Sequence, residues 1–401
     1  MEKVKAEVVT HYRSELVEYL RANGSTFAYG DTGIRLAKEF GFCYGVERAI
    51  DLAYAARRHF PREQPVYILG EIIHNPHVND QIRDMGVTFL SGSHKAADID
   101  DLGEGDPVVI PAFGTEVKVN EMLKARGCTV IDATCGDVMS VWKRVRQNAR
   151  EQVTSIIHGK AWHEETKATS SQAKAYENGH YLVVFDLDET DSVCRYITRG
   201  GDREAFLKKF EGATSDGFDP DKHLEAIGLA NQTTMLRGET EEVQRRLRAA
   251  MVEKNGEDAI AGHFRYFDTI CGATQDRQDA LRDLLSRPMD LLLVVGGYNS
   301  SNTSHLAEMG EGKLPTYFIK DASEIESAER LNHFLQHKQE MVIAENWLPL
   351  EGELTVGITA GASCPNNLIE EVILKTYELR GAPASEVLDS IRAESADGMA
   401  Q

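Results

Sequence analysis

Three cysteines in this sequence occupy the same kind of position, between a strand-like run and an amphipathic helical pattern. They are Cys43, Cys135 and Cys271. A thiol at the start of a helix lies at the positive end of the helix dipole, which favours the thiolate form. Thiolates are soft ligands that suit iron–sulfur clusters or zinc. Three protein ligands leave one metal position open, as a catalytic site requires, so the pattern favours a catalytic metal centre.

The spacing of these cysteines leaves a simpler interpretation open. No compact C-x-x-C motif accompanies them, and each one alone is as readily explained as a buried small hydrophobic residue. The other three cysteines do not share the junction: Cys128 lies within a strand-like run, Cys194 within a helical pattern and Cys364 within a loop. Disulfides are rare in large intracellular proteins, so metal binding, catalysis or packing remain the choices.

Several loops that follow strand-like runs are rich in groups that could bind a phosphate. Residues 296–304 and 359–365 combine glycines with hydroxyl and amide side chains. Backbone N–H groups and hydroxyls at a helix start form an anion site. Histidines and a Glu pair follow two other strand-like runs, in residues 71–76 and 158–166, and residues 231–234 add further hydroxyls. Ordinary helix capping by Ser and Asn is the alternative explanation.

The elements that position these residues alternate between strand-like and helical patterns from Gly33 onward. Such alternation predicts an α/β fold with largely parallel sheets. In sheets of this kind, ligands bind outside the carboxyl ends of the strands, where all three cysteines are predicted to lie. We expect residues 200–222, which are polar and aperiodic, to be an insertion.

Composition limits the classes of protein to consider. The chain has 401 residues, of which 42% are hydrophobic, and a formal net charge of −20. Such an acidic chain is a poor partner for nucleic acid or an anionic membrane, because phosphate binding needs clustered Lys and Arg. No apolar run approaches the ~20 residues of a membrane helix. The first residues lack an apolar signal segment and contain several acids, so we expect a cytoplasmic protein, or a plastid stromal one in mature form.

Taken together, the motifs resemble the family of 4-hydroxy-3-methylbut-2-enyl diphosphate reductases, and the long plant and cyanobacterial form more than the short one. The resemblance runs from about residue 25 to 380. It is carried by GFCYGVERAI (41–50), EIIHNP (71–76), PAFGTEV (111–117), DATC (132–135), IIHGKAWHEET (156–166), ANQTTMLRGETEE (230–242), TICGATQDRQDA (269–280), VVGGYNSSNTSHL (294–306) and TAGAS (359–363).

The resemblance implies an oxidoreductase of isoprenoid precursor synthesis, at the end of the methylerythritol phosphate pathway. Its fold would be three αβα units in a pseudo-threefold arrangement around a central [4Fe–4S] cluster with one open iron. The expected divisions are an N-terminal extension (1–30), a first unit with Cys43 (31–135), a second associated with Cys135 (136–265), a third with Cys271 (266–380) and a flexible tail (381–401).

The resemblance also assigns roles to individual residues. Cys43, Cys135 and Cys271 would ligate the cluster, and Glu165 would relay protons. The substrate diphosphate would be bound by His74, His163, Thr233, Ser300, Ser301, Asn302 and Ser363. The reaction would be a reductive dehydroxylation to isopentenyl and dimethylallyl diphosphate, with electrons from a ferredoxin or flavodoxin.

Three positions depart from the family pattern. Phe113 stands where short forms have His, Gly136 stands where Pro is usual and should loosen the following helix, and Cys364 adds a thiol that could be prone to oxidation. Two other functions stay open from the residues. One is a different three-cysteine, open-iron enzyme, such as a quinolinate-synthase-like protein or a dehydratase, and the other is a cluster-based redox sensor. A dinucleotide enzyme is disfavoured because no G-x-G-x-x-G opens a helix.

Overall fold

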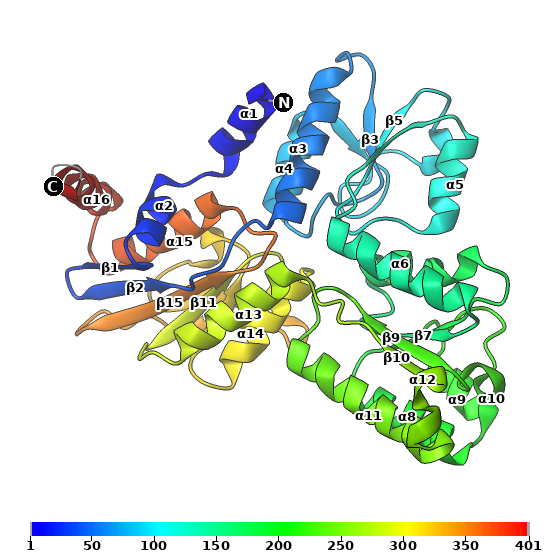
Figure 1. Ribbon diagram of the computed structural model, residues 1–401. Helices are drawn as coiled ribbons and strands as arrows, with labels where there is room; N and C mark the ends of the chain where they lie inside the picture. Colours follow the sequence, from blue (N-terminus) through cyan, green and yellow to red (C-terminus); the bar gives the residue numbers. More distant parts are fainter. Residues whose placement is uncertain (1, 399–401) are drawn as a thin grey trace. The chain divides into compact units, whose positions relative to one another are not determined.

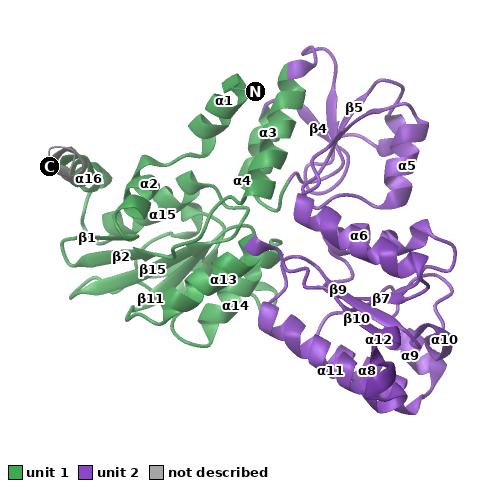
Figure 2. Ribbon diagram, in the orientation of Figure 1, with its two compact units in different colours: residues 1–58, 73–84, 273–401 green, residues 59–72, 85–272 purple. Residues whose placement is uncertain are grey.

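A computed structural model describes residues 2–398, and the chain divides into two compact units (Figure 1, Figure 2). Unit 1 comprises Met1–Arg58, Ile73–Asp84 and Ala273–Gln401, and unit 2 comprises His59–Ile72 and Met85–Gly272. The α/β class is confirmed, because three mainly parallel sheets carry the fold. Within residues 2–398, no helix has the length and apolar character needed to cross a membrane.

Unit 1 is built on one five-stranded sheet of order β1-β2-β15-β11-β12. These strands are β1 (Thr26–Tyr29), β2 (Thr32–Leu36), β11 (Leu291–Val295), β12 (Thr316–Ile319) and β15 (Leu354–Ala360). All neighbours are parallel except the β1–β2 hairpin. Every residue of β11 is buried, as expected for a central strand covered on both faces.

The helices of unit 1 come from both ends of the chain. They are α1 (Glu2–Tyr12), α2 (Glu15–Ala22), α3 (Tyr44–His59), α4 (Pro76–Asp84), α13 (Gly272–Leu285), α14 (Ser301–Glu311), α15 (Asn366–Leu379) and α16 (Ala384–Gly398), with a short turn η4 (Ala322–Glu324). A separate antiparallel pair, β13 (Arg330–Leu335) and β14 (Glu340–Glu345), completes the unit. Residues of α2, α15 and α16 share one hydrophobic core with the sheet.

Unit 2 contains two four-stranded parallel sheets. The first has the order β4-β3-β5-β6 and the second β10-β9-β7-β8. Their strands are β3 (Val66–Ile68), β4 (Val87–Phe89), β5 (Pro107–Ile110), β6 (Thr129–Asp132), β7 (Thr154–His158), β8 (Tyr181–Val184), β9 (Ile227–Asn231) and β10 (Phe264–Tyr266).

The connections in unit 2 are mostly helical. The helices are α5 (Val117–Ala125), α6 (Gly136–Arg150), α7 (Glu164–Ser171), α8 (Leu187–Arg199), α9 (Arg203–Lys209), α10 (Pro220–His223), α11 (Arg237–Asn255) and α12 (Ile260–His263), with short turns η1 (Ile99–Asp101), η2 (Ala173–Ala175) and η3 (Glu257–Ala259). Helix α6 begins at Gly136 with Cys135 as its N-cap.

The sheet pairing differs from the divisions expected from the sequence. Strand β2, expected in the first unit, pairs with β15 near the end of the chain, and β1 from the expected extension forms the sheet edge. The expected flexible tail contains α16, in which Val387 and Ile391 are buried; residues 399–401 lie outside the described chain. The apolar side chains of this helix, packed against the sheet core, hold it in place.

The expected insertion at 200–222 is also part of a core. It forms α9 and α10, and Phe206, Phe210 and Phe218 are buried with residues of the β7–β9 sheet. Three buried aromatic side chains make this segment a structural element of unit 2.

Candidate functional site

Cys135 and Cys271 occupy equivalent positions in the two sheets of unit 2. Cys135 follows β6, and its backbone N–H donates to the carbonyl of Ala112, which follows the neighbouring strand β5, at 2.8 Å. Cys271 follows β10, and its N–H donates to the carbonyl of Thr233, which follows the neighbouring strand β9, at 3.1 Å. Each cysteine directly precedes a helix, α6 or α13.

Cys43 in unit 1 repeats this arrangement. It directly precedes α3, and its N–H donates to the carbonyl of Ala362 at 3.2 Å. Ala362 follows β15, which pairs with β2, the strand before Cys43. All three cysteine residues are partly exposed. One backbone hydrogen bond therefore fixes each cysteine at a strand end and a helix start, which is the local setting that the sequence predicted.

The remaining cysteines lie in different surroundings. Cys364 is fully buried in the hydrophobic core of unit 1, and this burial raises the pKa of its thiol. Burial likewise raises the pKa of Cys194 to about 12. A thiol kept protonated in an apolar core is a poor nucleophile, so the oxidation risk expected for Cys364 is not supported.

Glu165 is a buried carboxylate of unit 2. It is 4% exposed, whereas its neighbour Glu164 is exposed. Its Oε1 accepts from the Thr233 N–H at 2.6 Å, and its Oε2 accepts from the Thr233 hydroxyl at 3.0 Å. Because the carbonyl of Thr233 also accepts from Cys271, continuous hydrogen bonds connect Glu165 to the cysteine segment.

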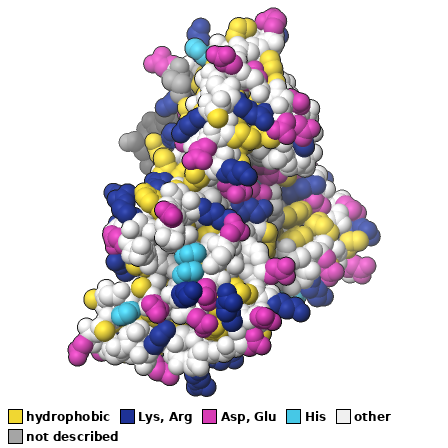
Figure 3. Space-filling view, turned by 90° about the vertical axis from the view of Figure 1, so that its right-hand side faces the viewer, with side chains coloured by type: hydrophobic (Ala, Val, Ile, Leu, Met, Phe, Trp, Pro, Cys, Tyr) yellow, Lys and Arg dark blue, Asp and Glu magenta, His cyan; other side chains and the backbone are white. Residues whose placement is uncertain are grey.

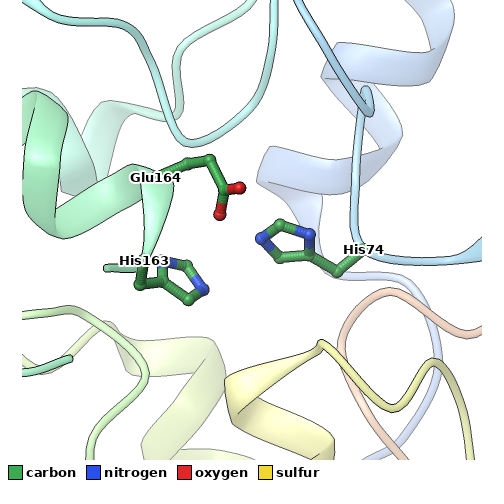
Figure 4. Close-up of side chains that lie close together, drawn as sticks. All are labelled: His74, His163 and Glu164. Atoms are coloured by element: carbon green, nitrogen blue, oxygen red, sulfur yellow. The ribbon is translucent and has the colours of Figure 1, made fainter. Parts of the chain in front are cut away.

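His163 is the N-cap of α7, directly before the Glu pair (Figure 4). Its Nδ1 accepts from the Glu165 N–H at 3.1 Å. In the neutral ring the proton must then lie on Nε2, which becomes the donor. His163 is therefore oriented by the same helix start that carries Glu165.

The loop before α7 is held to the loop after β9 by Gln232. The Oε1 atom of Gln232 accepts from the Lys160 N–H and from the Thr166 hydroxyl, both at 3.1 Å. Gln232 was not among the predicted site residues, although its place in the Asn-Gln-Thr-Thr run was a visible signal. Gln232 therefore connects the segment that leads into α7, where Glu165 lies, to the segment after β9, where Thr233 lies.

Unit 1 gathers hydroxyls where β11 and β15 end. Ser300 is the N-cap of α14, and its Oγ accepts from the Thr303 hydroxyl at 3.0 Å. Ser363, after β15, has its Oγ 3.3 Å from the Ser300 Oγ and donates to the carbonyl of His74 at 3.2 Å. Two adjacent parallel strands therefore bring these hydroxyls together, as expected for a ligand site at the carboxyl ends of strands.

Two buried polar atoms in this cluster have no partner within the described residues. They are the Oγ of Ser301 and the Nδ2 of Asn302, each on a residue 3% exposed. The Oδ1 of Asn302 accepts from the Ala362 N–H at 2.9 Å, which aims the amide. Buried polar groups are almost always paired, so these two atoms are suited to bind a polar ligand.

Close backbone packing shapes this region. A Cβ atom at Gly361 would lie 1.9 Å from the Thr303 Oγ1, and one at Gly297 would lie 2.5 Å from the His74 carbonyl oxygen. Only glycine fits such approaches. Thr303, which was not among the predicted site residues, thus packs against the loop after β15 as well as donating to the N-cap Ser300.

His74 lies in the loop before α4 in unit 1 (Figure 4). Its Nδ1 lies 3.4 Å from the Nδ2 of Asn299, and its carbonyl accepts from Ser363. The predicted residues therefore form two sets. Unit 1 has Cys43, His74, Ser300, Ser301, Asn302 and Ser363, and unit 2 has Cys135, His163, Glu165, Thr233 and Cys271.

The chain is similar to known proteins over most of its length. The sequence profile of the LytB protein family matches residues 34–376. A 4-hydroxy-3-methylbut-2-enyl diphosphate reductase of Thermosynechococcus vestitus is 48% identical over 94% of this chain and 92% of that protein. The reductase of Gloeobacter violaceus is 45% identical over 99% and 95%.

Solved structures show the same resemblance. One of (E)-4-hydroxy-3-methyl-but-2-enyl diphosphate reductase, described as the terminal enzyme of the non-mevalonate pathway, is 29% identical with a TM-score of 0.52 and covers 86% of this chain and 99% of its own. The reductase structure from Plasmodium falciparum, at 20% identity and a TM-score of 0.63, covers 90% and 98% and supports the fold.

Proposed function

This chain belongs to the LytB family, and we propose that it reduces 4-hydroxy-3-methylbut-2-enyl diphosphate to isopentenyl and dimethylallyl diphosphate, the last step of the non-mevalonate pathway. The observation that carries the proposal is the similarity to reductases of this diphosphate over nearly the whole chain. The site geometry supports the proposal. Thiols could ligate a cluster, a buried carboxylate could supply a proton, and buried polar atoms without a partner could bind the diphosphate. We propose that it acts in the cytoplasm or the plastid stroma.

The family depends on iron–sulfur chemistry, and we propose a single [4Fe–4S] cluster ligated by Cys43, Cys135 and Cys271. The donor set fits the group, since three partly exposed cysteines at helix starts offer soft sulfur ligands and leave one iron without a protein ligand. When bound, such a cluster passes electrons singly and offers its open iron as a Lewis acid. A ferredoxin or flavodoxin would supply those electrons.

The reaction removes the allylic hydroxyl of the substrate. The C–O bond breaks, two electrons and two protons are consumed, one proton leaves with the hydroxyl as water, and the other is added to carbon. Glu165 is the proposed proton donor, because a positioned carboxylic acid can protonate a leaving hydroxyl. The Thr233 hydroxyl contacts Oε2 and can accept from a protonated Glu165 as well as donate to the carboxylate.

The hydroxyl cluster of unit 1 is the proposed diphosphate site. Ser301 Oγ and Asn302 Nδ2 would satisfy their hydrogen bonds on phosphate oxygens, and Ser300 and Ser363 lie beside them. The positive end of α14 adds attraction for an anion. We propose His74 and His163 as further donors to the diphosphate.

The test is anaerobic oxidation of a reduced viologen dye by the cluster-reconstituted protein, with and without 4-hydroxy-3-methylbut-2-enyl diphosphate. We expect dye oxidation that depends on this substrate. Single Cys→Ser variants at Cys43, Cys135 and Cys271 should lose both turnover and the visible absorption of the cluster. The matched controls Cys128→Ser and Cys194→Ser should keep both.

Two results would contradict the proposal. If the wild-type protein shows full visible absorption but no substrate-dependent oxidation of the dye, it does not catalyse the proposed reaction. A Cys43, Cys135 or Cys271 variant that keeps full absorption and turnover would remove that cysteine from the ligand set.

A further inference from the structure

Helix α6 carries positive charge although the chain as a whole is strongly acidic. Its sequence contains Lys143, Arg144, Arg146 and Arg150 and a single acid, Asp137, in a chain of net charge −20. On the molecular face shown in Figure 3, Lys and Arg side chains alternate with Asp and Glu side chains. A helix with such an excess of cations is therefore a local exception.

Two of these cations are available to a partner. Lys143 and Arg144 are exposed, and within residues 2–398 neither forms an ion pair. Arg146 and Arg150 instead donate to Gln172 and Tyr176. An unpaired surface cation keeps its full attraction for an approaching anion, subject to screening by salt.

The other basic pair that the sequence offers is not available. Arg57 is 7% exposed, and Arg58 forms an ion pair with Glu7. A negative partner could contact neither without breaking existing interactions. Of the two clusters, only the one on α6 therefore presents unpaired charge.

An exposed apolar side chain accompanies the α6 cations. Met139 is 40% exposed and lies one turn before Lys143, on the same side of the helix. Its N–H donates to the carbonyl of Cys135 at 3.0 Å. A flexible methionine beside cations is the composition of an adaptable protein-binding surface.

This surface also contacts the segment of the second cysteine of unit 2. The guanidinium of Arg144 lies 4.5 Å from the ring centroid of Phe267. Phe267 stands in the loop that runs from β10 to Cys271. The cationic helix face therefore lies along both cysteine-bearing segments of unit 2.

We propose that Met139, Lys143, Arg144 and Phe267 form the α6 docking face, which binds an acidic one-electron carrier protein. The proposal rests on the proposed function, because only a reductase fed by such a carrier needs this surface. Each docking delivers one electron from the reduced carrier, which leaves oxidised, so two dockings supply the two electrons of one turnover. Electrostatic attraction at the face offsets the repulsion between two acidic proteins.

The test compares two electron donors on the holoenzyme. Turnover is measured with reduced plant-type ferredoxin and with reduced viologen, and the readout is the ratio of the two rates at subsaturating donor. We expect the double charge reversal Lys143→Glu/Arg144→Glu to lower this ratio by about tenfold at low ionic strength. High salt should reduce the difference between wild type and variant, because it screens the charges.

Two controls separate docking from general damage. Arg199→Glu/Lys208→Glu makes the same charge change at exposed residues of α8 and α9 and should leave the ratio within twofold. Lys143→Glu alone removes no contact to Phe267, and it should lower the ratio by a smaller factor while the visible absorption per protein stays unchanged.

The outcomes distinguish this inference from the proposed function. If wild type turns over with viologen but the α6 reversal leaves the ratio unchanged, or the control reversal lowers it equally, the α6 docking face is wrong and the reductase assignment stands. If wild type with an intact cluster reduces no substrate with either donor, the proposed function itself fails.

Discussion

Thr233 shows how a residue assigned to one task can serve another. The resemblance placed it in the diphosphate pocket, yet both its N–H and its hydroxyl are directed at Glu165. With both donors engaged, this threonine orients the carboxylate, and its carbonyl holds Cys271. No sequence pattern could have predicted that pairing, because Glu165 at the start of α7 and Thr233 after β9 stand far apart in the chain.

We therefore predict that Thr233→Val lowers kcat by about tenfold to a hundredfold with little change in KM, since a hydrogen bond to a charged group is lost. Steady-state viologen-coupled turnover measures both constants. Thr233→Ser, which keeps the hydroxyl, should restore most of kcat. Thr234→Val is the matched control, because Thr234 bonds Gln232 instead. A raised KM with unchanged kcat would return Thr233 to the diphosphate pocket.

At the scale of elements, the sequence predicted the features that depend only on neighbouring residues. The three strand–Cys–helix junctions follow from apolar periodicity and were found where expected. The pairing of β2 with β15 was missed, because partner choice between strands so distant in sequence depends on tertiary packing. Helix α16 was missed because its small, acidic composition hides the few apolar residues, Val387 and Ile391, that anchor it.

The segment between α8 and β9 makes a pH-dependent contribution to stability. His180, before β8, stacks on His223 of α10, with ring centroids 3.5 Å apart. Burial lowers the pKa of both rings, and His180 lowers that of His223 further. In the unfolded chain both rings bind a proton at the ordinary histidine pKa of ~6.5. The stabilisation is therefore full above that pH and is lost as pH falls through the lower folded-state pKa.

We predict that the Tm of the protein falls on acidification below pH ~6.5, and that His180→Gln/His223→Gln makes this fall shallower. Thermal unfolding followed by circular dichroism over a pH series checks this. His263→Gln is the control, since that ring bonds the carbonyl of Glu225 and is not in the stacked pair. An equally steep fall in the double variant would show that other groups cause it.

At the scale of the whole molecule, the net charge of −20 predicted the absence of a nucleic-acid role but concealed the α6 docking face. A basic run is visible in sequence at both 57–58 and 143–150. Only the structure distinguishes them, because burial and ion pairing decide whether a cation is available. The sequence therefore predicted the family, and the roles of the cysteines and of the loops after the strands stay predictions, while the exposure and pairing of each cation depend on tertiary contacts.

The negative net charge of the chain and the positive charge of α6 should produce opposite responses to salt. Raising KCl from roughly 0.02 M to roughly 0.3 M should increase the Tm, because screening relieves repulsion within an acidic chain. It should also slow ferredoxin-driven turnover, because screening weakens attraction at Lys143 and Arg144. Parallel thermal unfolding and turnover series test this. A Tm that falls with salt would mean that surface ion pairs outweigh the net repulsion.

The backbone bonds of the three cysteines bear on the energy of an added electron. The N–H groups of Cys43, Cys135 and Cys271 all donate to carbonyl oxygens. An N–H that pointed at a cluster sulfur would stabilise the reduced, more negative state and raise the reduction potential. Because these amides are engaged elsewhere, they add no such stabilisation. In the proposed cluster, hydrogen bonds that stabilise the reduced state would therefore come from other amides, such as those that open α3, α6 and α13.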